Sequence, residues 1–278
     1  MRDVLPAIIT DAVRRLCLEA AVRLEPDVTT ALRGALDTEE SPLGKDALEQ
    51  IIKNFEIAEK EDVPICQDTG IAVFFIEVGS EVSIKGSLEG AVNEGVRRGY
   101  KEGHLRNSVC DPLNRKNTGD NTPAIIHLTI VEGDRIKIRF APKGAGSENM
   151  SALRMLKPAD GVEGIKKIVL DSIASAQGNP CPPIVVGIGI GGNFELSAIL
   201  SKKALLRSIG MKNPSKEVAL LETELLLGIN KLGIGPMGFG GTITALAVHI
   251  ETAPCHIASL PIAINIQCHA DRHKETVI

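Results

Sequence analysis

The chain has 278 residues, of which 44% are hydrophobic and 24% are charged, and its net charge is -4 at pH 7. That length allows one large domain or two modest ones with an apolar core, and the acidic balance argues against nucleic-acid binding. Aromatic residues make up only 3%, which disfavours stacking on bases or sugars, so we expect a small-molecule ligand.

The amino-terminal segment does not have the pattern of a secretory signal. Asp3, Asp11, Arg14 and Arg15 interrupt its apolar residues, and no stretch approaches the roughly 20 apolar residues that span a bilayer. We therefore expect a cytoplasmic protein whose six cysteines are reduced thiols or metal ligands instead of disulfides.

The first half of the chain predicts helices followed by strands. Apolar residues repeat at helical spacing before residue 60, as at Leu48, Ile52 and Phe55. A buried strand is predicted over 71–78, and a hairpin over 124–131 and 135–141 with its turn at 132–134. A helix is predicted between them over 88–101.

The second half alternates helices and strands without a strict βαβ rhythm. Helices are predicted over 162–176, 194–207 and 216–231, and strands over 184–190, 242–250 and 258–266. The expected fold class is mixed α/β (α+β), with a helical amino-terminal segment followed by β-sheets flanked by helices. No linker or repeat divides the chain, so we expect a single catalytic domain over 1–278.

Three cysteines lie in predicted loops beside prolines, glycines or small polar residues: Cys66, Cys181 and Cys268. Three thiolates are one too few for a closed tetrahedral metal site, which suggests a metal with one position open to substrate or water. The other three, Cys17, Cys110 and Cys255, are better explained as small buried hydrophobes.

Three glycine-rich segments have competing interpretations. Residues 187–192 lack the spacing of a dinucleotide fingerprint, which favours a tight turn with close backbone packing. Residues 143–149 form either a plain turn or an anion site made by exposed backbone N–H groups. Residues 235–242 serve either packing or close approach to a ligand.

His256 also has two interpretations. Alone it would be an ordinary buried histidine, but a strand over 257–266 would let His256 and Cys268 reach one pocket, which favours catalysis.

Several motifs, taken in order, resemble the iron-sulfur class of fumarate hydratases and the related tartrate dehydratases. They are residues 64–70 (PICQDTG), 143–149 (KGAGSEN), 181–183 with the following glycines, 256–259 (HIAS) and 268–272 (CHADR). The resemblance covers nearly the whole chain, which looks like the alpha subunit of the two-subunit form.

The resemblance implies a [4Fe-4S] cluster held by Cys66, Cys181 and Cys268, with the fourth iron taking a substrate hydroxyl and carboxylate. It further implies roles for five other positions: Gln67, Arg106 and the backbone at Gly146 would bind substrate carboxylates, and Asp68 with His256 would form a polar pair near the hydroxyl.

Single-chain members continue into a second domain, whereas this sequence stops ten residues after Cys268. We therefore expect a separate beta subunit, an alpha-beta hetero-oligomer and a small dicarboxylate substrate. The expected reaction is reversible hydration of fumarate to L-malate. L(+)-tartrate dehydration is the close alternative, and a redox or regulatory iron-sulfur protein is an alternative from another class.

Overall fold

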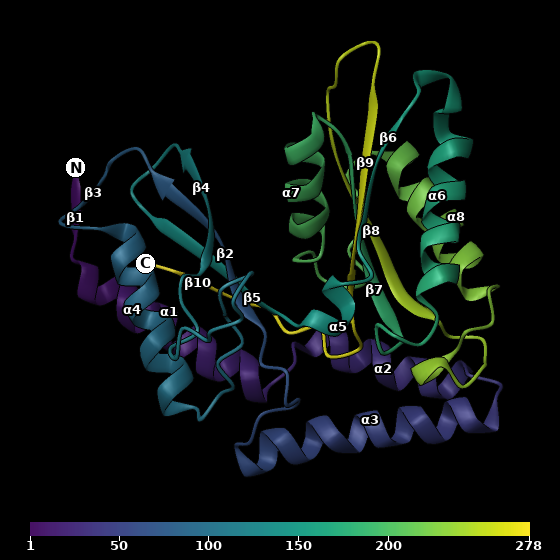
Figure 1. Cartoon of the computed structure of the whole chain (residues 1–278), viewed down its shortest axis with the longest axis horizontal. Helices are drawn as coiled ribbons and strands as arrows, with labels where there is room; N and C mark the ends of the chain where they lie inside the picture. Colours follow the sequence, from purple (N-terminus) through teal and green to yellow (C-terminus); the bar gives the residue numbers. More distant parts are fainter. The chain divides into compact units, whose positions relative to one another are not determined.

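The computed structural model describes residues 1–278 and divides them into two compact units (Figure 1). Unit 1 comprises Met1–Glu25, Asn54–Ala145 and Arg272–Ile278, and unit 2 comprises Pro26–Lys53 and Gly146–Asp271. The mixed α/β class is confirmed, while a single catalytic domain stays a prediction. None of the helices is both long and apolar enough to cross a membrane.

Unit 1 is built on a four-stranded sheet with the order β10-β5-β2-β4. Its elements are β1 (Arg2–Val4), α1 (Pro6–Val22), β2 (Ile71–Gly79), β3 (Val82–Ile84), α4 (Leu88–Glu102), β4 (Ile125–Val131), β5 (Ile136–Lys143) and β10 (Lys274–Val277). The short strands β1 and β3 form a separate parallel pair.

The predicted hairpin of β4 and β5 is wrong, although both strands exist. Instead, β2 lies between them, parallel to β4 and antiparallel to β5. The connection passes over the end of β2, where Gly79 donates to the carbonyl of Arg135 at 2.8 Å. A Cβ on Gly79 would lie 2.2 Å from the carbonyl oxygen of Gly133, so this crossing requires glycine.

The core of unit 1 lies between the sheet and the helices α1 and α4. Fully buried residues such as Ile9, Val92, Phe74 and Ile138 form one cluster, and Phe74 stacks on Phe140 with ring centroids 4.9 Å apart. Burial of such side chains contributes roughly 1.5–3 kcal/mol each.

Unit 2 contains a four-stranded sheet with the order β6-β9-β7-β8. Its elements are α2 (Pro26–Thr38), β6 (Ala152–Leu156), α6 (Gly161–Ala176), β7 (Ile184–Gly191), α7 (Phe194–Ala204), α8 (Lys216–Asn230), β8 (Ala245–Ala253) and β9 (Leu260–Gln267). The boundary between the two units falls within two helices, α3 (Pro42–Glu61) and α5 (Ala145–Glu148).

The sheet of unit 2 has β7 at its centre, parallel to β8 and antiparallel to β9. Isoleucines, leucines and valines of α6 and α8 pack against these strands in a second core. The strand β7 begins at the predicted residue, β8 begins three residues later than predicted because the Gly235–Thr242 segment is a loop, and β9 begins two residues later than predicted.

The glycines of β7 bring α7 close to the sheet. A Cβ on Gly187 would lie 2.2 Å from the carbonyl oxygen of Ser201, and one on Gly189 would lie 2.0 Å from that of Ser197. This confirms the prediction of close backbone packing.

Candidate active site

The loop that carries Cys66 joins α3 to β2 and is fixed by hydrogen bonds inside unit 1. The backbone of Ile65 donates to Ala21 at 2.9 Å, and Asn54 Nδ2 donates to the carbonyl of Ile65 at 2.9 Å. The amide of Asp68 points at Cys66 Sγ at 3.4 Å. Such an N–H group stabilises a thiolate or a metal-bound sulfur.

The carboxylate of Asp68 connects two segments of the backbone that are far apart in the sequence. Oδ1 accepts from the amide of Gly70 at 3.0 Å, and Oδ2 accepts from the amide of Ala145 at 2.8 Å. A Cβ on Gly144 would lie 3.0 Å from Asp68 Oδ2. The carboxylate therefore has a defined orientation beside Gly144 and Ala145.

Buried polar side chains also hold the loop that carries Cys66. Tyr100 donates its hydroxyl to the carbonyls of Thr69 and Gly70 at 2.9 and 3.1 Å, and Arg272 Nη2 donates to the carbonyl of Asp68 at 2.8 Å. Burial raises the pKa of Tyr100, so the phenol stays a donor. Arg272 is only 2% exposed.

Arg106 lies beside this loop, and its guanidinium is exposed. Its carbonyl accepts from Thr69 Oγ1 at 2.9 Å. Asn121, which is fully buried, joins the segment after Arg106 to the loop that carries Cys66. Its side chain accepts from the amide of Ser108 at 2.6 Å and donates to the carbonyl of Gly70 at 3.1 Å. The backbone at Arg106 is thus fixed while its side chain stays available.

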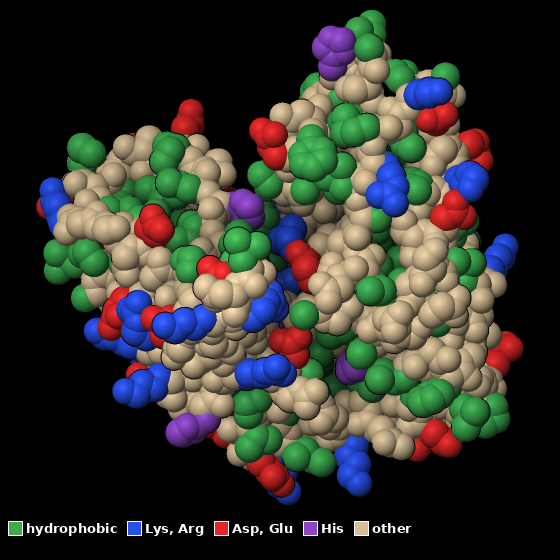
Figure 2. All heavy atoms as spheres, in the orientation of Figure 1, with side chains coloured by type: hydrophobic (Ala, Val, Ile, Leu, Met, Phe, Trp, Pro, Cys, Tyr) green, Lys and Arg blue, Asp and Glu red, His purple; other side chains and the backbone are tan.

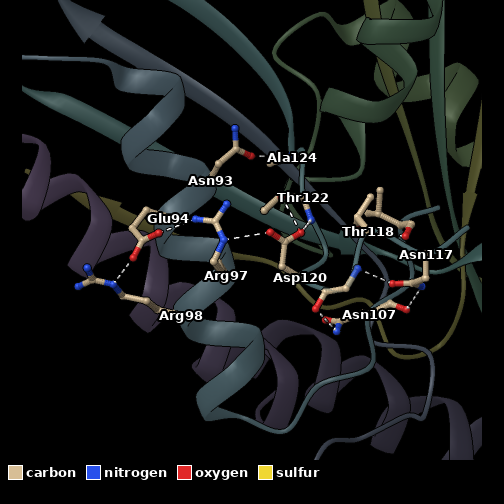
Figure 3. Close-up of polar contacts among 12 residues, drawn as sticks. Asn93, Glu94, Arg97, Arg98, Asn107, Asn117, Thr118, Asp120, Thr122 and Ala124 are labelled. Atoms are coloured by element: carbon tan, nitrogen blue, oxygen red, sulfur yellow. Dashed lines mark hydrogen bonds and ion pairs between the residues drawn. The ribbon is translucent and has the colours of Figure 1, made fainter. Parts of the chain in front are cut away.

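A polar network anchors the segment that follows Arg106 (Figure 3). Asp120 accepts from Arg97 Nε on α4 at 2.9 Å and from Thr122 Oγ1 at 2.7 Å. Asn117 and Asn107 hold the loop closed, because Asn117 Nδ2 donates to the carbonyl of Asn107 at 2.9 Å. Burial alone would raise the pKa of Asp120. Hydrogen bonds from Thr122 and Arg97 outweigh this effect and hold the pKa below its usual range.

The KGAGSEN segment continues into unit 2, where Gly146 lies exposed in α5. At the end of α5, Glu148 accepts from Lys202 Nζ at 2.7 Å and from Asn265 Nδ2 at 2.8 Å. These contacts tie α5 to α7 and β9, so the backbone around Gly146 rests on regular elements.

Unit 2 brings Cys181 and Cys268 to the same end of its sheet. Cys181 lies in the turn before β7, and Cys268 directly follows β9, whose Gln267 pairs with Val185 of β7. The carbonyl of Cys181 accepts from the amide of His269 at 3.2 Å, and His269 Nδ1 lies 3.0 Å from the same oxygen. Cys181 itself has a positive φ of 56°.

The Gly235–Thr242 loop supports the Cys181 turn. The amide of Met237 donates to the carbonyl of Pro182 at 2.8 Å, and a Cβ on Gly178 would lie 3.2 Å from Cα of Gly238. This loop therefore serves packing, one of its two predicted uses.

Glu39 anchors the far end of that loop. Only 1% exposed, it accepts from the amides of Ser41 and Ile243 and from both the amide and the hydroxyl of Thr242, at 2.8 to 3.2 Å. Burial alone would raise the pKa of Glu39, but the backbone N–H donors outweigh it and hold the pKa below its usual range.

His256 is exposed at the connection between β8 and β9, at the opposite end of the unit 2 sheet from Cys181 and Cys268. Its Nδ1 accepts from the amide of Ala258 at 3.1 Å. The expectation that the strand after His256 lets it reach one pocket with Cys268 is wrong within unit 2, because β9 runs straight between them.

The remaining three cysteines differ in how deeply they are buried. Cys17 is 1% exposed on α1, which confirms its burial, and burial raises the pKa of its thiol. Cys110 is half-buried and Cys255 is exposed, so their predicted burial is wrong. Cys255 lies in the turn before β9, where no core surrounds it.

Comparison with known proteins places the chain in a family. The family model for fumarate hydratase (Fumerase) matches residues 10–277. A Methanocaldococcus jannaschii protein named "Putative L(+)-tartrate dehydratase subunit alpha" is 52% identical over 95% of both chains. Proteins named L(+)-tartrate dehydratase subunit alpha from Escherichia coli (strain K12) and Shigella sonnei are 34% identical over 95% of this chain and 88% of theirs.

These matches define a hydro-lyase. The chain belongs to the fumarate hydratase (Fumerase) family.

Proposed function

We propose that this chain is the alpha subunit of an iron-sulfur hydro-lyase whose substrate is L(+)-tartrate. The observation that carries the proposal is the 52% identity, over 95% of both chains, to a relative that bears this name. The reaction removes water from a hydroxy dicarboxylate, so it needs groups that bind two carboxylates, activate a hydroxyl and move protons.

The donor chemistry of three cysteines in this chain suits a [4Fe-4S] cluster with three protein ligands. Cys66, Cys181 and Cys268 form no disulfide and lie in loops, and Cys66 Sγ already faces a backbone N–H. Bound there, the cluster would supply a Lewis acid for the substrate hydroxyl.

The chain's own cation and amide groups would hold the substrate. The guanidinium of Arg106 can grip one carboxylate through two parallel hydrogen bonds, and Gln67, which is also exposed, can donate its amide hydrogens. Backbone N–H groups around Gly146 would supply further donors. Fixed donors of this kind also stabilise negative charge that develops during the reaction.

Asp68 would manage the proton of the substrate hydroxyl, whereas a role for His256 beside it stays a prediction, because His256 lies at the opposite end of the unit 2 sheet from Cys181 and Cys268. The carboxylate of Asp68 is oriented by the amides of Gly70 and Ala145, which leaves its remaining lone pairs to accept a proton from a bound hydroxyl or water. The hydrogen bond from Ala258 to His256 Nδ1 leaves Nε2 as the nitrogen that can face a substrate.

We further propose a beta subunit as the partner, because the relatives are named as alpha subunits. The second candidate substrate pair is fumarate and L-malate, which is favoured by the description of the family model. Both candidates use the same cluster and carboxylate-binding groups.

Turnover of L(+)-tartrate, L-malate and fumarate, measured anaerobically after cluster reconstitution with a co-expressed beta subunit, tests the proposal. We expect tartrate to have the highest kcat/KM and activity to require the beta subunit. A preference for malate or fumarate would select the second candidate, and full activity of the alpha subunit alone would contradict the partner.

A further inference from the structure

Arg272 places a positive charge in the interior of unit 1, beside the loop that carries Cys66. The side chain is only 2% exposed, and a guanidinium cannot be deprotonated in a protein. Burial of a charge is costly unless hydrogen bonds and an opposite charge compensate for it. A buried cation at this position therefore needs a compensating partner.

Several other arginines of the chain have acidic partners. Figure 2 shows Lys and Arg side chains gathered with acidic ones on the unit 1 surface over α4, where the exposed Arg97 and Arg98 form ion pairs. In unit 2, the side chain of Arg207 is 10% exposed and pairs with the carboxylate of Glu222. Arg272 differs from these arginines, because the acceptor of its hydrogen bond is a carbonyl.

That hydrogen bond uses only part of the Arg272 guanidinium. Nη2 donates to the carbonyl of Asp68 at 2.8 Å, while Nε and Nη1 are buried without a hydrogen-bond partner in the chain. Buried polar atoms are satisfied in the great majority of cases in native structures. The remaining N–H groups of this cation thus indicate that an anion belongs beside the loop.

The charge of Arg272 also acts on the groups that surround it. Burial raises the pKa of Tyr100, the positive charge of Arg272 opposes this rise, and the carboxylate of Asp68 adds to it. Interactions between charges weaken with distance. The guanidinium, the phenol and the carboxylate therefore lie near one another in unit 1.

Asp68 is held through its backbone as well as its side chain. Its amide points at Cys66 Sγ at 3.4 Å, and its carbonyl accepts from Arg272. Its carboxylate accepts from the amides of Gly70 and Ala145. A rotation of Asp68 would carry its amide away from the sulfur and its carboxylate away from Ala145, and the hydrogen bond from Arg272 opposes that rotation.

We infer that Arg272 is a positioning residue of the proposed active site, which fixes Asp68 through its carbonyl and places a buried positive charge beside the Cys66 loop. The inference rests on the proposed function. Three thiolates and a dicarboxylate substrate bring negative charge to that site, and a cation stabilises such charge more strongly in a protein interior than in water. Arg272 acts through Asp68 and through its charge, without contact to the substrate.

Hydrogen exchange of the apo-protein tests the positioning role without cluster or turnover. In Arg272→Gln, we expect the amides of residues 68–70 to exchange at least about tenfold faster than in wild type, because the loop loses a charged donor. Arg272→Lys keeps the charge and should give an intermediate rate, and it serves the same test if Arg272→Gln does not fold. Unchanged exchange at residues 68–70, or equal acceleration there and in α1, would overturn the role.

Arg207→Gln is the matched control, because it also removes a buried guanidinium. The substitution breaks the ion pair with Glu222 in unit 2, so exchange should accelerate in α8 and stay unchanged at residues 68–70. Faster exchange at residues 68–70 in this control would mean that loss of any buried arginine loosens the loop, which contradicts a specific role for Arg272.

The reduction potential of the reconstituted cluster, measured with the beta subunit present, tests the role of the charge. Such potentials depend on net charge and on hydrogen bonds near the cluster. Because reduction adds negative charge, Arg272→Gln should shift the potential to more negative values, whereas Arg272→Lys should lie close to wild type. Equal potentials of wild type and Arg272→Gln would overturn this role. A wild-type protein that binds no cluster would contradict the proposed function, while hydrogen exchange would still decide the positioning role.

A double-mutant cycle tests whether Arg272 acts through Asp68. Arg272→Gln should lower kcat by about tenfold in the wild-type background and by less than about twofold in Asp68→Asn, where the group that it positions is already lost. Equal factors in the two backgrounds would contradict the route through Asp68.

Discussion

At the scale of single residues, Glu39 shows how a buried charge can organise a distant loop. Its carboxylate accepts backbone donors from residues 41, 242 and 243 and has no cationic partner among its hydrogen bonds. Hydrogen bonds to a charged group stabilise a fold by about 1.5–3 kcal/mol each, and here they fix the loop that contacts the Cys181 turn.

The stabilisation by Glu39 depends on pH. Because its pKa is lower in the folded than in the unfolded protein, its contribution is fully present above the unfolded pKa and disappears as pH falls through the folded pKa. We expect Glu39→Gln to lower the free energy of unfolding by about 2 kcal/mol at pH 7, and the difference from wild type to shrink from about pH 5 downward. Urea unfolding at several pH values measures it.

The neighbouring Glu40 supplies the control for this prediction. It is exposed, so Glu40→Gln should change stability by less than about 0.5 kcal/mol at any of these pH values. A Glu39→Gln deficit that stays constant down to pH 3 would contradict the assigned ionisation.

Sequence patterns identify the residues whose chemistry is local and miss those whose partners are remote. The segment 64–70 stands out because a cysteine, an amide and an acid are consecutive. Glu39 and Tyr100 bind backbone groups far along the chain, and any peptide bond can be such a partner. Only the folded structure can therefore reveal them.

At the scale of elements, the contact between β7 and α7 depends on the absence of side chains. The carbonyl of Ser197 occupies the space where a Cβ on Gly189 would lie. Because packed interiors have little free volume, a methyl group there must displace α7 from the sheet.

We expect Gly189→Ala to destabilise unit 2 by roughly 1–3 kcal/mol through overpacking. Gly34→Ala is the matched control, since that glycine lies in α2 with nothing within 4 Å of an added Cβ, and it should stabilise by about 0.5–1 kcal/mol through better helix propensity. Thermal unfolding of the two variants measures the contrast, and equal melting temperatures would contradict it.

The β4–β5 hairpin shows why strand order is harder to predict than strand position. A three-residue turn between two apolar runs favours direct pairing. However, β2 is buried along nearly all its length, which requires neighbours on both sides. The burial of β2 therefore favours its pairing with both β4 and β5 over direct pairing of β4 with β5 across the local turn.

At the scale of the whole molecule, unit 1 is closed by residues that follow unit 2 in the sequence. The strand β10 pairs with β5 through residues 274–277, and Ile278 exchanges backbone hydrogen bonds with Ile136. Pairing at such a sequence distance cannot be read from periodicity, although the mixed class of the fold can.

Deletion of residues 274–278 should expose β5 as an edge strand. We expect hydrogen exchange to show lost protection in β5 and retained protection in β7 and β9, because β10 belongs only to the unit 1 sheet. Glu275→Gln keeps the backbone pairing and removes only a surface ion pair with Lys137, so its exchange should match wild type. Uniform loss of protection in both units would contradict independent sheets.

The return of the chain to unit 1 also sets an order of events during synthesis. The loop that carries Cys66 is among the early segments to leave the ribosome, yet its hydrogen bond from Arg272 becomes possible only after all of unit 2 has been translated. Until then, Asp68 lacks this contact, and β5 lacks its neighbour. A nascent chain would thus expose an unfinished Cys66 loop throughout translation of unit 2, so this loop matures only after unit 2 has been made.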